Sequence, residues 1–77
     1  MNDLIEFLIT NIIGTDDIKI EEETEDSKVN YIIEAKPDYV GLIIGKEGKT
    51  IKNLRKIVSI RATLENKVVN LTVQPSQ

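Results

Sequence analysis

The chain has 77 residues, enough for one domain, and a formal net charge of −3. It contains no cysteine and no histidine, which excludes disulfides, thiolate metal sites, cysteine nucleophiles and the commonest general base. No apolar run approaches the roughly 20 residues needed to cross a bilayer, and the N-terminus lacks the basic region of a secretory signal, so we expect a cytoplasmic protein.

The first segment predicts a helix. Asn2 or Asp3 can cap its start, and Gly14 stands where the end of a helix favours a left-handed residue. The helix has one apolar face, which consists of Leu4, Ile5, Leu8, Ile9 and Ile12.

Two strands are expected next, close enough in the chain to form a hairpin. Ile18 and Ile20 alternate with polar residues, as in a half-buried strand, and the polar run 22–28 is predicted to be the turn. The second strand ends at Pro37 and has alternating apolar residues at Val29, Tyr31, Ile33 and Ala35.

The second half predicts a helix–loop–helix unit followed by a last strand. A short apolar helix, which Asp38 can cap, leads into the loop 45–48, and a longer helix runs from Lys49 to about Glu65. The last strand contains Val68, Val69, Leu71 and Val73 and is stopped by Pro75. The long crossover between the second and third strands makes these two strands parallel.

These elements predict an α+β fold of order α-β-β-α-α-β. We expect a three-stranded mixed sheet with the helices packed on one face. The single domain covers residues 1–77, with a folded core at about 4–73 and a tail at 74–77.

Charge is distributed unevenly along the chain. Residues 1–38 carry eleven acids and three lysines, a net charge of −8, whereas residues 39–77 carry seven basic residues and two acids, a net charge of +5. Five of these seven basic residues fall within 46–56, and such a patch attracts anions despite the negative total.

The loop 45–48 has the residues of a phosphate-binding turn. Gly45 and Gly48 permit backbone angles and a close approach that a Cβ prevents, and the free amides of the following helix lie at the positive end of its dipole. A backbone phosphate can therefore lie against this turn. Basic residues extend the positive track, namely Lys46, Lys49, Lys52, Arg55 and Lys56. A tight interhelical turn without a ligand is the alternative interpretation of the two glycines alone.

The surrounding residues favour the binding interpretation. Ile44, Gly45, Gly48 and Ile51 match position by position the Ile-Gly-x-x-Gly-x-x-Ile signature of KH domains, and the order of elements resembles the type II, prokaryotic arrangement. From about Leu4 to Val73, the chain resembles the small single-domain bacterial KH proteins of the KhpA (YlqC) family.

This resemblance implies a noncatalytic protein that binds single-stranded RNA, with four nucleotides gripped by the loop. Val40, Ile43 and Ile44 are candidates for one side of the base groove, with core packing as their alternative, and part of the last strand for the other side. Glu47 places a negative charge in the loop, which predicts weak RNA binding by the protein alone. A role as an RNA chaperone or post-transcriptional regulator follows, with no metal and no cofactor.

The long helix carries a second apolar strip, formed by Ile57, Ile60 and Leu64, beside the face that meets the sheet. Either the first helix covers this strip or the strip is an oligomer interface. The family resemblance implies a homodimer, or a heterodimer with a larger KH-containing RNA-binding protein of the KhpB (Jag) type.

The sequence also bears on three rival functions. A P-loop is rejected because it requires glycine at position 43, which is isoleucine. A two-carboxylate hydrolase would depend on the acids within 21–26, which suit a solvated hairpin tip better. A KH-fold protein-interaction module with little RNA binding of its own stays open, because the net charge and Glu47 favour it.

Overall fold

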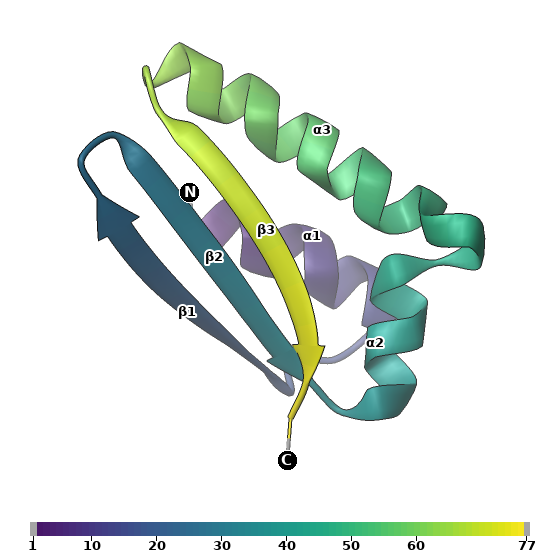
Figure 1. Ribbon diagram of the computed structural model, residues 1–77. Coiled ribbons are helices and arrows are strands. Elements are labelled where there is room, and N and C mark those ends of the chain that lie inside the picture. Colours follow the sequence, from purple (N-terminus) through teal and green to yellow (C-terminus); the bar gives the residue numbers. More distant parts are fainter. Residues whose placement is uncertain (1, 77) are drawn as a thin grey trace.

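The computed structural model describes residues 2–76 as three helices packed on a three-stranded sheet (Figure 1). The elements are α1 (Asn2–Ile13), β1 (Ile18–Glu25), β2 (Lys28–Ala35), α2 (Pro37–Ile44), the 3-10 turn η1 (Lys46–Gly48), α3 (Lys49–Leu64) and β3 (Val68–Pro75). The strand order is β1-β2-β3, with β1 antiparallel and β3 parallel to β2. The predicted α+β class, element order and mixed sheet are therefore confirmed. No helix within residues 2–76 is long and apolar enough to cross a membrane.

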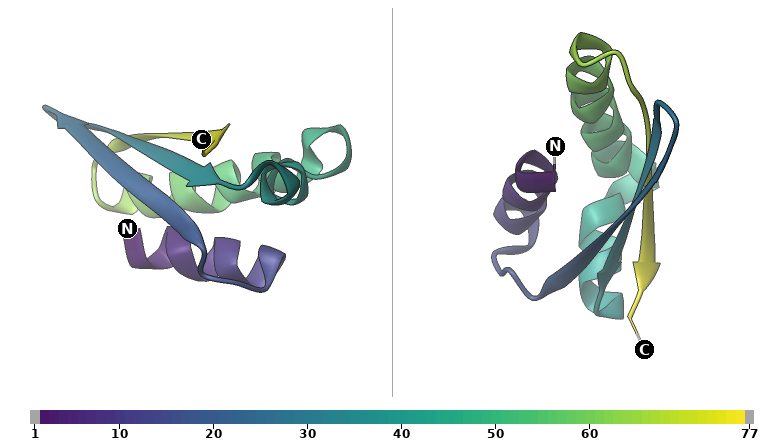
Figure 2. Two further views of the ribbon diagram at one scale, coloured as in Figure 1. Left: turned by 90° about the horizontal axis from the view of Figure 1, so that it is seen from below. Right: turned by 90° about the vertical axis from the view of Figure 1, so that its left-hand side faces the viewer.

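The core lies between the sheet and the helices, which occupy the same face of the sheet (Figure 2). Alternate residues of β2 are buried, as the period of two predicts, and they are Val29, Tyr31, Ile33 and Ala35. The helices contribute Ile5, Ile9, Ile43, Ile51, Leu54 and Val58, and β3 contributes Leu71. Burial of each such aliphatic side chain stabilises the fold by about 1.5–3 kcal/mol.

The hairpin differs from the sequence prediction. The predicted turn at 22–28 is wrong, because β1 continues to Glu25 and only Asp26 and Ser27 form the turn. The ladder pairs Glu22 with Tyr31 and Glu25 with Lys28. Since β1 is an edge strand that is exposed along this stretch, charged side chains there stay in water, and such charges also protect an edge from pairing with other chains.

The helix starts also differ from the predictions. Asn2 and Asp3 lie inside α1 rather than before it. Asp38 does not cap α2, because Lys36 precedes the helix and Pro37 is its first residue. Proline suits this position because its fixed φ is already helical and it has no N–H to leave unpaired.

The helix and strand ends near the two termini are defined by backbone hydrogen bonds. Gly14 adopts the predicted left-handed conformation, with φ of 75°, and its N–H donates to the carbonyl of Thr10 at 2.8 Å. β3 extends to Pro75, and the N–H of Ser76 donates to the carbonyl of Ala35 at 2.8 Å. Part of the segment expected to be a tail is therefore paired with β2, and residue 77 lies outside the described residues.

Candidate nucleic-acid interface

The loop between α2 and α3 depends on left-handed backbone angles. Gly45 has φ of 77° and Gly48 has φ of 73°, and Glu47 between them has φ of 58°. A Cβ on Gly45 would also collide with the side chain of Thr50, whereas a Cβ on Gly48 would meet nothing within 4 Å. Gly45 is therefore required both for its backbone angle and for its close packing against α3. Gly48 is required for its backbone angle alone.

The N-terminal end of α3 has no side-chain cap. Gly48 occupies the capping position, and the first turn contains no acidic residue. The N–H of Lys49 donates to the carbonyl of Lys46, so the amides that follow it are the ones that can meet an anion. With 16 residues, α3 has a full helix dipole whose positive end lies at this loop. Lys46 and Lys49 flank the turn, so the backbone and the side chains attract the same kind of ligand.

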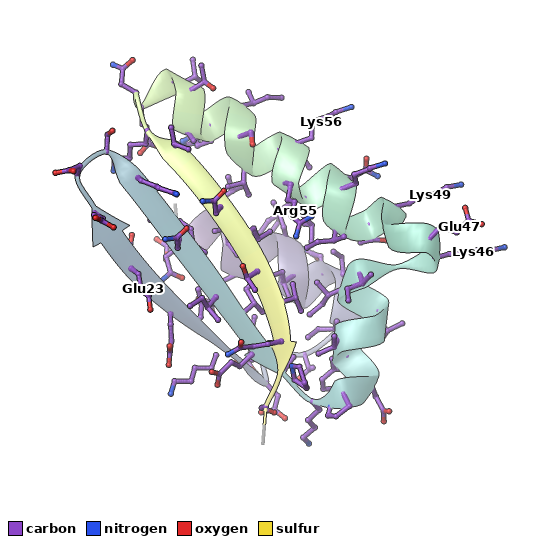
Figure 3. The ribbon with its side chains drawn as sticks, in the orientation of Figure 1. Glu23, Lys46, Glu47, Lys49, Arg55 and Lys56 are labelled. Atoms are coloured by element: carbon purple, nitrogen blue, oxygen red, sulfur yellow. The ribbon has the colours of Figure 1, made fainter. Side chains whose placement is uncertain are left out.

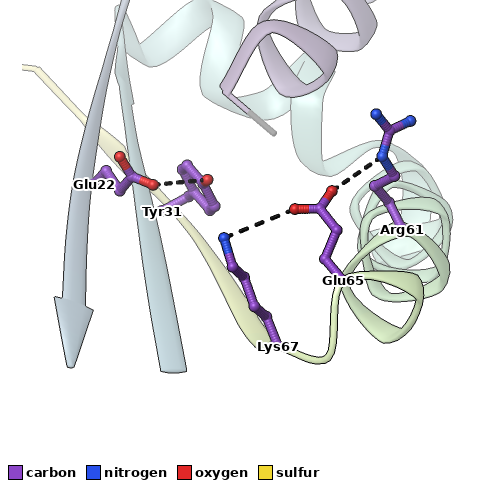
Figure 4. A network of polar contacts seen from close by, with 5 residues as sticks. All are labelled: Glu22, Tyr31, Arg61, Glu65 and Lys67. Carbon is purple, nitrogen blue, oxygen red and sulfur yellow. Dashed lines mark hydrogen bonds and ion pairs between the residues drawn. The ribbon is translucent and has the colours of Figure 1, made fainter. Parts of the chain in front are cut away.

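Four lysines of this region are exposed and unpaired. Lys46, Lys49, Lys52 and Lys56 form no ion pair with any carboxylate among residues 2–76. Figure 3 shows Lys46, Lys49 and Lys56 directed away from the sheet. The salt bridges of the described residues lie elsewhere: Lys19–Glu21, Lys36–Asp17, Arg61–Glu65 and Lys67–Glu65, the last two drawn in Figure 4.

Arg55 occupies a different place from these lysines. Its side chain extends from α3 toward β3 (Figure 3), where Nε and Nη2 donate to the carbonyl oxygen of Leu71 at 3.3 and 3.2 Å. A groove between α3 and β3 opens at this point, lined by Arg55, Ser59, Val69, Asn70, Leu71 and Thr72 together with Asn30 of β2. The predicted positive track along α3 therefore divides into outward lysines and an arginine in the groove.

The three apolar candidates for the groove have different exposures. Ile44 is 37% exposed and Val40 is half-buried. Ile43 is 0% exposed, so its side chain cannot contact RNA and its assignment as a groove residue is wrong. It faces the core because α2 must bury one stripe to attach the loop to the sheet.

Glu47 lies at the tip of the loop. Its side chain is exposed and projects beyond the ribbon beside Lys46 and Lys49 (Figure 3). The carboxylate accordingly lowers the positive potential of the loop without disturbing its packing.

The second apolar strip of α3 is exposed. Ile57 is 43%, Ile60 is 62% and Leu64 is 77% exposed. A groove between α1 and α3 is lined by Leu8, Asn11, Ile12, Thr50, Asn53, Leu54 and Ile57, so α1 approaches only the first part of α3. The interpretation that the first helix covers the whole strip is therefore wrong.

The comparisons with known proteins agree with this geometry. Residues 2–73 match the model of a family described as KhpA/KhpB, KH domain. The chain belongs to the KhpA/KhpB KH-domain family. Membership in this family of KH proteins confirms the resemblance and the expectation of a noncatalytic chain.

Three relatives named RNA-binding protein KhpA cover nearly the whole chain. The protein from Oceanobacillus iheyensis is 35% identical over 95% of this chain and 99% of its own length. The protein from Halalkalibacterium halodurans is 30% identical over 95% of this chain and 97% of its own length. That from Chlamydia caviae is 35% identical over 95% of each chain.

Sequence reasoning expected part of the last strand beside the groove without naming its residues, which are Val69, Asn70, Leu71 and Thr72, and it missed Thr50 beside Gly45. Thr50 lies two positions after Gly48, the second glycine of the signature, and this spacing was the only signal in the sequence for its contact with Gly45. No local pattern connects Arg55 with Leu71, because their contact depends on tertiary packing. Among the described residues, no group of three or more Asp or Glu side chains is placed to hold a metal ion.

Proposed function

We propose that this protein binds single-stranded RNA by holding the phosphate backbone on the loop 45–48. The observation that carries the proposal is the coincidence, at one loop, of two left-handed glycines, a helix N-terminus without a side-chain cap and two unpaired lysines, Lys46 and Lys49. Two more unpaired lysines, Lys52 and Lys56, follow along α3. The names of the relatives, RNA-binding protein KhpA, support the same ligand.

The parts of the site have distinct roles in this proposal. The phosphates contact the backbone of Gly45–Gly48 and the side chains of Lys46 and Lys49, while Lys52 and Lys56 attract the flanking phosphates. The bases enter the groove between α3 and β3. Ile44 and Val40 of α2, which lie outside the lining of this groove, contact the strand nearer the loop. Such a groove requires splayed, unpaired bases, which selects single strands over duplexes.

We expect a noncatalytic RNA-binding protein with a negative net charge to act as a cytoplasmic RNA chaperone or post-transcriptional regulator. Its affinity is limited because the net charge of −3 and the Glu47 carboxylate both oppose RNA. We therefore expect RNA binding that is weak at physiological salt and stronger at low salt.

The decisive experiment is fluorescence anisotropy of labelled single-stranded RNA at two salt concentrations. The variant Lys46→Asp, Glu47→Asp should bind at least tenfold more weakly than the wild type and lose part of its salt dependence, because one cation at the loop becomes an anion. Lys28→Asp is the matched control, since it makes the same change of charge at the hairpin, and it should stay within about twofold of the wild type. Circular dichroism verifies that each variant is folded.

Equal effects of the two variants would contradict the clamp. RNA binding that is absent with and without a partner protein would favour the alternative function, a KH-fold protein-interaction module.

A protein contact on α3 accompanies the RNA site in this proposal. The exposed strip Ile57, Ile60 and Leu64 is the surface through which two copies associate, or through which one copy associates with a larger KH-containing protein of the KhpB (Jag) type. Light scattering after size exclusion should give a dimer mass for the wild type and a monomer mass for Ile60→Asp. Leu42→Asp is the control, because Leu42 on α2 is also exposed, at 53%, and should leave the mass unchanged. A wild-type monomer mass, without and with the partner, would contradict this contact.

A further inference from the structure

The side chain of Arg55, which lines the groove between α3 and β3, is already hydrogen-bonded to a backbone carbonyl. Two N–H groups of Arg55 donate to the carbonyl of Leu71, at 3.3 and 3.2 Å, and both interactions are partly shielded from water. Arg55 forms no ion pair with the carboxylates of residues 2–76. A carbonyl oxygen has two lone pairs, so this acceptor is saturated in the free protein.

The backbone N–H and carbonyl groups of Leu71 point away from β2, whereas its side chain is buried in the core. β3 is an edge strand, and the N–H groups of Val68 and Ser76 donate to carbonyls on the β2 side, those of Ser27 and Ala35. Because successive residues of a strand direct their polar groups to opposite sides, Leu71 presents its own N–H and carbonyl to the open edge. The bond from Arg55 to that carbonyl agrees with this alternation.

The two groups of Leu71 form a donor beside an acceptor. Left free, this pair complements the N1 acceptor and N6 amino donor of adenine. With Arg55 in place, only donors remain, namely the Leu71 N–H and the unused guanidinium N–H groups. A guanine edge, with its adjacent O6 and N7 acceptors, fits donors, whereas the adenine amino group would meet an occupied carbonyl.

We propose that Arg55 sets the base preference of the groove, favouring guanine over adenine beside Leu71 by occupying the Leu71 carbonyl. The inference rests on the proposed RNA clamp, which delivers a base to this place. Arg55 follows Lys49 by six residues, about 9 Å along the helix, so a strand held at the loop brings its next bases to this level.

The test uses uridine hexamers that carry one guanosine or one adenosine at the fourth position, measured by fluorescence anisotropy. Wild type should bind the guanosine RNA at least about fivefold more tightly, the lower end of the discrimination that a good bidentate contact provides. Arg55→Met keeps most of the stem and frees the carbonyl, so the ratio should fall to one or invert toward adenosine. Arg55→Lys keeps the charge without the planar fork, and it should give an intermediate ratio.

Lys52→Met is the matched control, because it removes one positive charge from the same helix without touching Leu71. It should weaken both RNAs equally and leave the wild-type ratio intact. Binding of RNA by wild type with equal affinity for the two purines, or an unchanged ratio in folded Arg55→Met and Arg55→Lys, would overturn this inference and leave the clamp standing. Absence of RNA binding by wild type would overturn both.

Discussion

At the scale of single residues, the loop rests on two glycines with different structural roles. Gly48→Ala should lower the free energy of unfolding by about 1–2 kcal/mol, because only the left-handed angle opposes it. Gly45→Ala should cost more, since its Cβ also displaces Thr50 in the first turn of α3. Urea unfolding followed by circular dichroism measures both changes.

Gly41 provides the control for this comparison. It lies inside α2, and an added Cβ would meet nothing within 4 Å. Gly41→Ala should therefore stabilise the protein by about 0.5–1 kcal/mol through the higher helix propensity of alanine. Equal losses at positions 45 and 48 would contradict the role assigned to the Thr50 contact.

At the scale of elements, the β1–β2 hairpin contains a partly buried polar contact. The hydroxyl of Tyr31 donates to the carboxylate of Glu22 at 3.0 Å (Figure 4), and the two residues are direct partners in the ladder. Burial, and then the hydrogen bond and charge of Glu22, raises the pKa of Tyr31 from 10.0 to about 12. The folded protein thus holds this proton more tightly than the unfolded chain does.

The pH dependence of stability follows from this shift. Because the folded pKa exceeds the unfolded one, the contribution is complete below pH 10 and is lost as the pH rises from 10 toward 12. Tyr31→Phe should lower the free energy of unfolding by about 0.5–1.5 kcal/mol at pH 7. Urea unfolding between pH 9 and pH 12 should show a shallower decline for Tyr31→Phe than for wild type, and parallel declines would refute the assignment.

At the scale of the whole molecule, opposite charges lie at separate places. The acidic side chains of the hairpin, Glu23 among them, lie across the molecule from Lys46 and Lys49 (Figure 3). The molecule measures 33 × 24 × 19 Å, and its longest extent is about four times the Debye length of about 8 Å at physiological salt. Acids of the hairpin should therefore influence RNA at the loop only when salt is low.

Two charge-matched variants test this separation. Glu47→Gln should tighten RNA binding about two- to fivefold at physiological salt, because the lost charge lies within the loop. Glu23→Gln should have no effect there and should tighten binding by less than about twofold even at about 10 mM salt, where the Debye length is about 30 Å, because the Coulomb energy of a distant charge is small in water. Equal effects at physiological salt would refute local control by Glu47.

Much of the fold could be predicted because its patterns are local. The alternation in β2, the apolar stripe of α3 and the paired glycines each determine a local structure, and the long crossover implies parallel strands. The turn at Asp26 and Ser27 could not be predicted, because a solvated edge strand and a solvated loop have the same polar composition.

The groove was harder to predict than the loop. The burial of Ile43 and the exposure of Ile60 depend on where α1 and the sheet lie, and neither is encoded within one helix. The bond from Arg55 to Leu71 joins residues of different elements through a backbone carbonyl, which has no sequence signature.

The parallel pairing of β2 with β3 has a consequence for the order in which the protein is made. Partners such as Asn30 and Asn70 lie 40 residues apart, and of the elements of this domain β3 is synthesised after all the others. A chain that has already formed the hairpin and the glycine loop still lacks one wall of its groove. Closing that loop of 40 residues makes the docking of β3 a late step of folding. If the proposed RNA site is right, a nascent chain exposes its lysines to RNA before it can distinguish one base from another.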